Sequence, residues 1–180
     1  MSAAAGVRRE PRRRRLRASR PTASGRRFVE NGLQCSFLAK RKAMDDDLDE
    51  KIRSGKALSE SMGDFHVTGW DPERKTVRAA FTVRRAYCHT NGTIAQGGFI
   101  TAWLDAAMAH AVIHDTGHRQ TVFSLEIKVS FYEKVGPGDG RVEGRVIRRG
   151  KRVAFLEATL YNPEGQLAAH ATSTGLLADL

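Results

Sequence analysis

Two patterns of apolar side chains follow one another along this chain. Residues 65–70 and 75–84 alternate apolar and polar positions, as half-buried strands do, and Asp71-Pro72-Glu73 forms a turn between them. Residues 98–115 are instead rich in alanine and apolar on almost every side, which predicts a buried helix. Four further strand-like runs are separated by turn sequences that contain glycine. They span residues 121–132, 141–149, 152–162 and 167–177.

A shorter helix is expected before the first strand. The three aspartates at 45–47 suit the positive end of a helix, and apolar residues continue the pattern at Leu48, Ile52 and Leu58. The predicted order is therefore helix, two strands, buried helix and four strands. An antiparallel β-sheet wrapped around one long central helix is the economical way to bury that helix, so we expect an α+β fold.

The net charge of +10 lies almost entirely in the first 27 residues. They contain ten arginines and one glutamate, a net of +9, which leaves +1 for residues 28–180. A nearly neutral folded part gives no electrostatic reason to expect nucleic acid as a partner. No run approaches the roughly 18 apolar residues that cross a bilayer. We therefore expect neither nucleic acid nor a membrane as a partner.

The arginine-rich start of the chain has too few aliphatic residues to form a core, so we expect residues 1–43 to be disordered and one domain to span 44–180. Three interpretations stay open: a solvated basic arm, an organellar transit peptide, or residues upstream of a true start at Met44. Cys35 and Cys88 are too few for a disulfide framework. We expect a cytoplasmic protein, or a mitochondrial matrix protein if residues 1–27 are a transit peptide.

Candidate chemistry gathers at the buried helix. Gln96-Gly97-Gly98 stands at its start, where glycines let a ligand approach and free N–H groups can stabilise an oxyanion. The alternative is that both glycines only permit tight packing. Asp105 follows two turns later, and no lysine or arginine occurs from Gln96 to His118. A carboxylate without a local cation is either functional or bonded to backbone across the sheet.

These residues resemble the signature of the hotdog-fold thioesterases, specifically the PaaI-type branch. That signature combines an Asn-Gly loop, here Asn91-Gly92, with Gln96-Gly97-Gly98 and an aspartate nine residues after the glutamine, here Asp105. The resemblance extends over residues 45–178. It implies a hotdog fold and hydrolysis of acyl-CoA thioesters without a cofactor.

The resemblance also implies roles for single residues. The Gly97 amide would polarise the thioester carbonyl, Asp105 would activate water, Asn91 would support carbonyl or water placement, and Ser124 would help Asp105 to hold the water. Gln96 and Gly98 would contact the substrate. These groups would converge across a subunit interface, so a homodimer or a dimer of dimers is implied.

Two features depart from the family pattern, and two rival functions remain. Gln96 stands where a histidine is frequent, and the interval from Asn91 to Gly97 is unusual by about one residue. The rivals are a non-catalytic acyl-CoA-binding hotdog protein and a hotdog enoyl-CoA hydratase. His110, His114 and His118 have helical spacing, but we expect a glycine-terminated helix end rather than a metal site. The acyl chain is not readable from the sequence.

Overall fold

The structure is a computed structural model that describes residue 50 and residues 53–180. The segment 1–43, the predicted boundary at Met44 and the expected start of the first helix lie outside the described residues. Residues 53–61 are helical, in agreement with the later part of that predicted helix. The turn that follows is held in place, because the Thr82 N–H donates to Gly63 O at 2.7 Å and Ser59 Oγ donates to Phe65 O at 2.6 Å.

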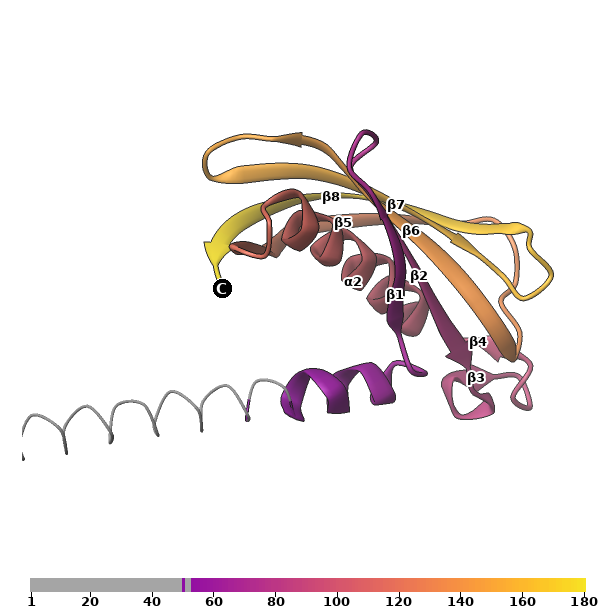
Figure 1. Ribbon diagram of the computed structural model, residues 1–180. Coiled ribbons are helices and arrows are strands. Elements are labelled where there is room, and N and C mark those ends of the chain that lie inside the picture. Colours follow the sequence, from indigo (N-terminus) through magenta and orange to yellow (C-terminus); the bar gives the residue numbers. More distant parts are fainter. Residues whose placement is uncertain (1–49, 51–52) are drawn as a thin grey trace, which may run out of the picture. The chain divides into compact units, whose positions relative to one another are not determined.

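Six strands form one antiparallel sheet in the order β1-β2-β6-β7-β8-β5 (Figure 1). Apolar side chains alternate with polar ones along them, so one face of the sheet is apolar. All six strands predicted from the sequence are confirmed. Their bounds are β1 His66–Asp71, β2 Thr76–Val83, β5 Gln120–Phe131, β6 Gly138–Arg149, β7 Val153–Tyr161 and β8 Leu167–Asp179.

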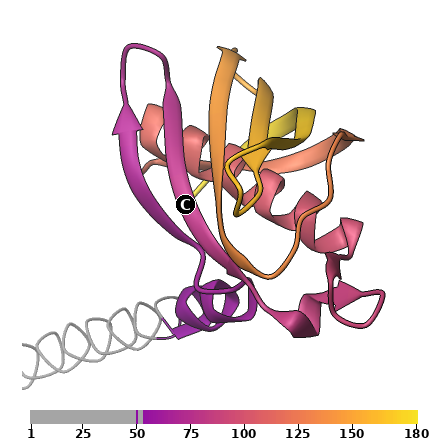
Figure 2. The same ribbon diagram turned by 90° about the vertical axis from the view of Figure 1, so that its right-hand side faces the viewer.

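One long helix, α2 (Gly97–Asp115), runs along the apolar face of this sheet (Figure 1, Figure 2). The predicted α+β fold, an antiparallel sheet around a central helix, is confirmed. Trp103 fixes the helix at its centre: its ring stacks on Phe81 at 4.2 Å and its Nε1–H donates to Met62 O at 2.8 Å. Gly144 of β6 lies where the helix crosses the sheet, since a Cβ there would come within 2.2 Å of Ala107 O.

Only one side of α2 is buried, which corrects the expectation of a helix buried all round. A single sheet covers that side, and the opposite side is half-buried because no second layer of the described chain packs on it. The buried residues are Ile100, Trp103, Leu104, Ala107, Met108, Ala111 and Val112. The half-buried ones include Ala102, Asp105, Ala106, Ala109 and Ile113.

Sequence patterns missed a small hairpin between β2 and α2. It follows the 3-10 turn η1 (Arg85–Tyr87) and consists of β3 (Cys88–His89) and β4 (Ile94–Ala95). Strands of two residues are too short to show an alternation. Three successive residues at its tip, Thr90 to Gly92, have positive φ.

Among the described residues, no helix is both long enough and apolar enough to span a lipid bilayer.

Candidate active site

The structure brings two of the predicted site residues together. Ser124 Oγ on the edge strand β5 donates a hydrogen bond to Asp105 Oδ1 on α2, at 2.6 Å. Asp105 is half-buried and Ser124 is exposed. The β-bulge between Ser124 and Glu126 shifts the register of β5 next to this bond. The pair is therefore anchored on two rigid elements and open to water.

Asp105 differs from the other acid of the same helix. Asp115 is 8% exposed and forms ion pairs with Lys75 at 3.2 Å and Arg149 at 2.5 Å. Burial disfavours the charge of Asp115, but the hydrogen bonds and charges of Arg149 and Lys75 outweigh it and lower its pKa. No ion pair to Asp105 forms within residues 53–180. The partner of Asp105 is a hydroxyl group instead. No cation pairs with Asp105, as expected from the sequence, and its carboxylate is only half-buried.

The start of α2 presents a free backbone donor. Gln96 is the N-cap, and its Oε1 accepts the Gly98 N–H at 2.5 Å. The first helical amide, that of Gly97, has no acceptor within its helix, as expected at this position, nor elsewhere in the described chain. A cavity of about 220 Å³ adjoins it. That cavity is lined by Ile94, Ala95, Gly97, Ile100, Phe131, Glu133, Lys134 and Val135.

The remaining predicted site residues have different surroundings. Gln96 and Gly98 are exposed, and a side chain at Gly98 would meet Gln96 Oε1 at 2.6 Å. Asn91 lies at the tip of the β3–β4 hairpin with φ 57°, and its carbonyl oxygen accepts from Arg85 Nη2 at 2.9 Å. Within the described chain, no hydrogen bond joins Asn91 to Asp105 or Gly97.

Two of the three histidines noted in the sequence, His110 and His114, pack against aromatic rings, and the third, His118, is exposed beyond the end of α2. His110 stacks on Phe65 at 5.7 Å, and His114 stacks on Trp70 at 5.4 Å. Burial lowers the pKa of both rings, and the neighbouring histidines add to this effect. No group of three potential metal ligands occurs in the part of the chain that the structure describes.

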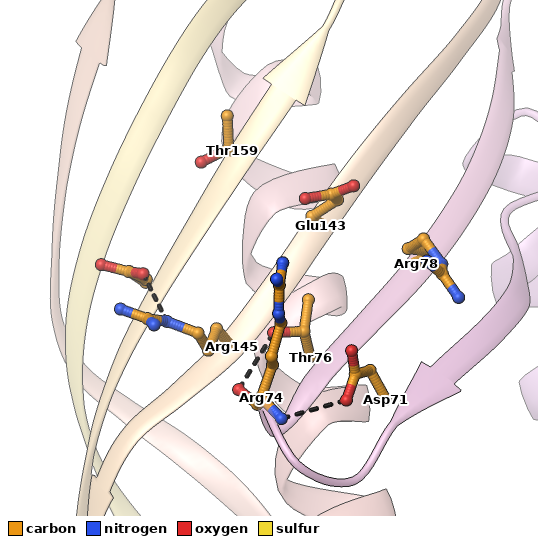
Figure 3. A pocket seen from close by; sticks show the side chains of 8 residues that line it. Asp71, Arg74, Thr76, Arg78, Glu143, Arg145 and Thr159 are labelled. Atoms are coloured by element: carbon orange, nitrogen blue, oxygen red, sulfur yellow. Dashed lines mark hydrogen bonds and ion pairs between the residues drawn. The ribbon is translucent and has the colours of Figure 1, made fainter.

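A charged hollow of about 310 Å³ lies on the other face of the sheet (Figure 3). Its walls are Asp71 and Arg74 at the β1–β2 turn and polar positions of β2, β6 and β7, which alternate with buried residues and so point away from α2. Within it, Arg145 Nε pairs with Glu157 Oε1 at 2.6 Å. The sheet separates this hollow from Asp105, so it is not part of the site.

One group of residues escaped the sequence interpretation. The end of β6 and the turn that leads to β7 read Arg148-Arg149-Gly150-Lys151-Arg152, and all five residues are exposed. We call it the basic turn. Arg119, in the turn between α2 and β5, lines a cavity of about 330 Å³ together with Arg149, Thr116, Gln120 and Asp179. The near-neutral net charge of residues 28–180 concealed this cluster. The net charge calculated over short segments of the sequence would have revealed it.

A profile of the thioesterase superfamily matches residues 92–169, a range that includes Gly97, Asp105 and Ser124. Among curated proteins, no match was found.

Solved structures share the fold. A phenylacetic acid degradation-related protein from Ralstonia eutropha has 26% identity and a TM-score of 0.61, over 67% of this chain and 89% of that one. A mutant of PaaI from Thermus thermophilus has 25% identity and a TM-score of 0.57, over 67% and 97%. The E. coli PaaI protein has 14% identity and a TM-score of 0.61, over 72% and 90%, which supports the fold alone. The predicted resemblance and the hotdog fold are confirmed.

Proposed function

From the premise that this chain is a hotdog-fold thioesterase, we propose that it hydrolyses acyl-CoA thioesters to a free acid and CoA, with Asp105 as the catalytic base. The observation that carries the proposal is the hydrogen bond from Ser124 to Asp105 Oδ1. It leaves the second carboxylate oxygen available to a water molecule. Asp115, on the same helix, is neutralised by Lys75 and Arg149 and has no such freedom.

The chemistry needs one base and one oxyanion donor. A carboxylate oxygen of Asp105 takes a proton from water while the water oxygen bonds to the thioester carbon. The carbonyl oxygen becomes an oxyanion, and the Gly97 N–H donates a hydrogen bond to it. Collapse of this intermediate breaks the carbon–sulfur bond and releases the CoA thiolate, which is protonated. The free acid remains as the second product.

Two chains are needed for one site in this proposal. Gly97 and Asp105 are eight residues apart on one helix, which separates them by roughly 12 Å along its axis. One carbonyl cannot contact both. β5 offers a suitable interface, because it is an edge of the sheet and exposes Phe123 and Leu125, each at 62%, on either side of Ser124. We infer a homodimer in which Gly97 of one subunit faces Asp105 of the other, and a dimer of dimers remains compatible.

The basic turn supports CoA as the carrier of the acyl group. Phosphates of CoA are anions, and arginine binds them through paired hydrogen bonds. Arg149 contacts Asp115, ten residues beyond Asp105 and therefore roughly 15 Å along α2. An extended pantetheine arm is about as long as four extended residues, roughly 14 Å. Phosphates at the basic turn would thus leave the thioester near Asp105.

The test is release of free thiol from a panel of acyl-CoA thioesters. We expect turnover by the native protein and a loss of at least about a hundredfold in Asp105→Asn, since general-base catalysis contributes that much or more. Asp115→Asn is the matched control on the same helix and should keep most of its turnover. Absence of thiol release from every thioester would favour the non-catalytic binding protein or the hydratase.

A second comparison tests the CoA assignment. Lys151→Glu combined with Arg152→Glu should raise KM for an acyl-CoA several-fold and leave KM for the same acyl group on N-acetylcysteamine unchanged, because the short thioester has no phosphates. Equal effects on both substrates would argue against phosphate binding at the basic turn.

A further inference from the structure

An apolar hollow of about 340 Å³ lies between the helical residues 53–61, strand β1 and α2. It has no function in the mechanism described so far. Its position is fixed by the bonds of Trp103 to Met62 and of Ser59 to Phe65. The lining residues with larger side chains are Leu58, Met62, Phe65, Val67 and His110, and Ala106 forms part of the α2 wall.

The hollow contains no lysine, arginine or acid among its described lining residues. Its two polar rings are histidines, and His66 lies exposed at the rim. The deeper ring, His110, stacks on Phe65 and forms no hydrogen bond within residues 53–180. Burial lowers the pKa of His110, so the ring is neutral near pH 7. The hollow therefore suits an apolar group and disfavours a charged one.

Asp105 does not line the hollow itself, but Ala106, the next residue of α2, does. Ala106 follows Asp105 directly and is separated from it by about 100° around the helix. Ala102 and Ala109 lie on the same half-buried side of α2. A chain of methylene groups can pass over these methyl groups from a carbonyl at Asp105 to the hollow. The other cavity near the site, next to Gly97, is also lined mainly by apolar side chains, but it is smaller, at about 220 Å³, and the exposed residues Glu133 and Lys134 form part of its wall.

We propose that this hollow, in the subunit that supplies Asp105, binds the apolar end of the acyl group, so that the preferred substrates carry a medium-length aliphatic or a single-ring aromatic acyl chain. The inference rests on the proposed function. A cavity of about 150 Å³ is enough for benzene, and the hollow has about 340 Å³, which admits a ring with a short linker or a chain of similar size. Acyl groups that end in a carboxylate should be poor substrates.

The experiment measures chain-length selectivity in the full-length protein. The quantity is the ratio of kcat/KM for octanoyl-CoA to kcat/KM for acetyl-CoA. Ala106→Leu fills part of the hollow and should lower this ratio about tenfold or more, since one to a few misplaced methylene groups are worth that much. Leu58→Ala enlarges the hollow from the opposite wall and should raise the ratio for dodecanoyl-CoA over octanoyl-CoA. Ratios that stay unchanged in both variants would overturn the proposal.

Binding of free octanoate gives a readout that does not need catalysis. Octanoate should raise the Tm of the native protein, and Ala106→Leu should abolish this shift. If the native protein releases no thiol from any acyl-CoA but Ala106→Leu abolishes the octanoate shift, the proposed function fails and the hollow is upheld as a binding site. If thiol is released but neither selectivity nor the octanoate shift responds to either variant, the proposed function stands and this inference fails.

Discussion

Ser124 and Asp105 are joined by a hydrogen bond of 2.6 Å between an edge strand and the central helix. The bond fixes one carboxylate oxygen and so orients the other. Ser124→Ala should lower kcat about tenfold with little change in KM, because one oriented hydrogen bond to a charged group is worth about 1.5 kcal/mol. Ser124→Thr keeps the hydroxyl and should restore most of the rate.

Ser130→Ala is the control for Ser124, since it removes a hydroxyl from the same strand away from Asp105. Steady-state kinetics of the three variants decide the matter. An equal loss in Ser130→Ala, or no recovery in Ser124→Thr, would show that the strand rather than the hydroxyl is responsible.

Gln96 caps α2, and the bond from the Gly98 N–H to its Oε1 predicts how substitutions behave. Gln96→Ala should reduce the free energy of unfolding by about 0.5 to 1 kcal/mol, as the loss of an exposed N-cap does. Gln96→His should keep or raise turnover, because a ring nitrogen can accept the same N–H and histidine is frequent here in the family that the sequence resembles. Urea unfolding and thiol release measure the two effects. A large fall in kcat of a folded Gln96→His variant would assign Gln96 a contact that imidazole cannot replace.

His110 should make stability depend on pH. Its pKa in the folded protein is lowered from 6.5, chiefly by burial, so the unfolded chain binds the proton more readily. The stability that the neutral ring contributes is present above about pH 6.5 and is lost as the pH falls below it. His110→Phe keeps the stacking on Phe65 and should flatten the loss of stability between about pH 7 and pH 5. The measurement is the Tm of both proteins across this pH range. If His110 is not the source of the pH dependence, the Tm of His110→Phe and the Tm of the native protein will fall in parallel as the pH falls.

Asp115 is predicted to respond to acid in a lower range. Because Arg149 and Lys75 lower its folded pKa below 3.8, its contribution is complete above that value and disappears as the pH falls through the folded pKa. Asp115→Asn should cost roughly 1 to 2 kcal/mol at pH 7, a figure reduced for the partly exposed partners. The difference from the native protein should vanish in strong acid. A constant difference at every pH would mean that packing, not charge, is lost.

The sequence predicted the strands well because their alternation is a local signal. β6 and β7, for example, are each buried on one face, so that buried side chains alternate with more exposed ones along much of each strand. The sequence could not predict that only one side of α2 is covered. The sequence pattern of an alanine-rich helix is the same whether one layer or two layers pack against it. The two-residue strands β3 and β4 are below the length at which periodicity exists.

The candidate site was predictable only in part. Asp105 was notable from the sequence alone, since no cation stands near it along the helix. Its contact with Ser124 joins residues 19 positions apart, and only the family resemblance suggested it. Asn91 matches the motif, and its role stays a prediction, because the only hydrogen bond of this residue in the described chain is the one that its carbonyl oxygen accepts from Arg85. The basic turn was missed because the total charge averages over distant residues.

The shared site can be tested with two inactive proteins. Gly97→Pro removes the proposed oxyanion donor at a backbone position that accepts proline, because proline is favoured at the first position of a helix and Gln96 before it already has extended backbone angles. A Cβ at this position would lie 3.3 Å from the exposed ring of Phe131, which has to shift by a few tenths of an ångström in both Gly97→Pro and Gly97→Ala. Asp105→Ala removes the base. Each variant alone should be inactive and folded, whereas Gly97→Ala keeps the N–H and should remain active.

After the two inactive proteins are dissociated and re-associated together, about half of the dimers should be mixed, and one of the two sites in each mixed dimer has both groups intact. About a quarter of native activity is then expected. Folded mixed dimers that stay inactive would contradict the cross-subunit arrangement, and full activity of Asp105→Ala alone would contradict the catalytic role of this carboxylate.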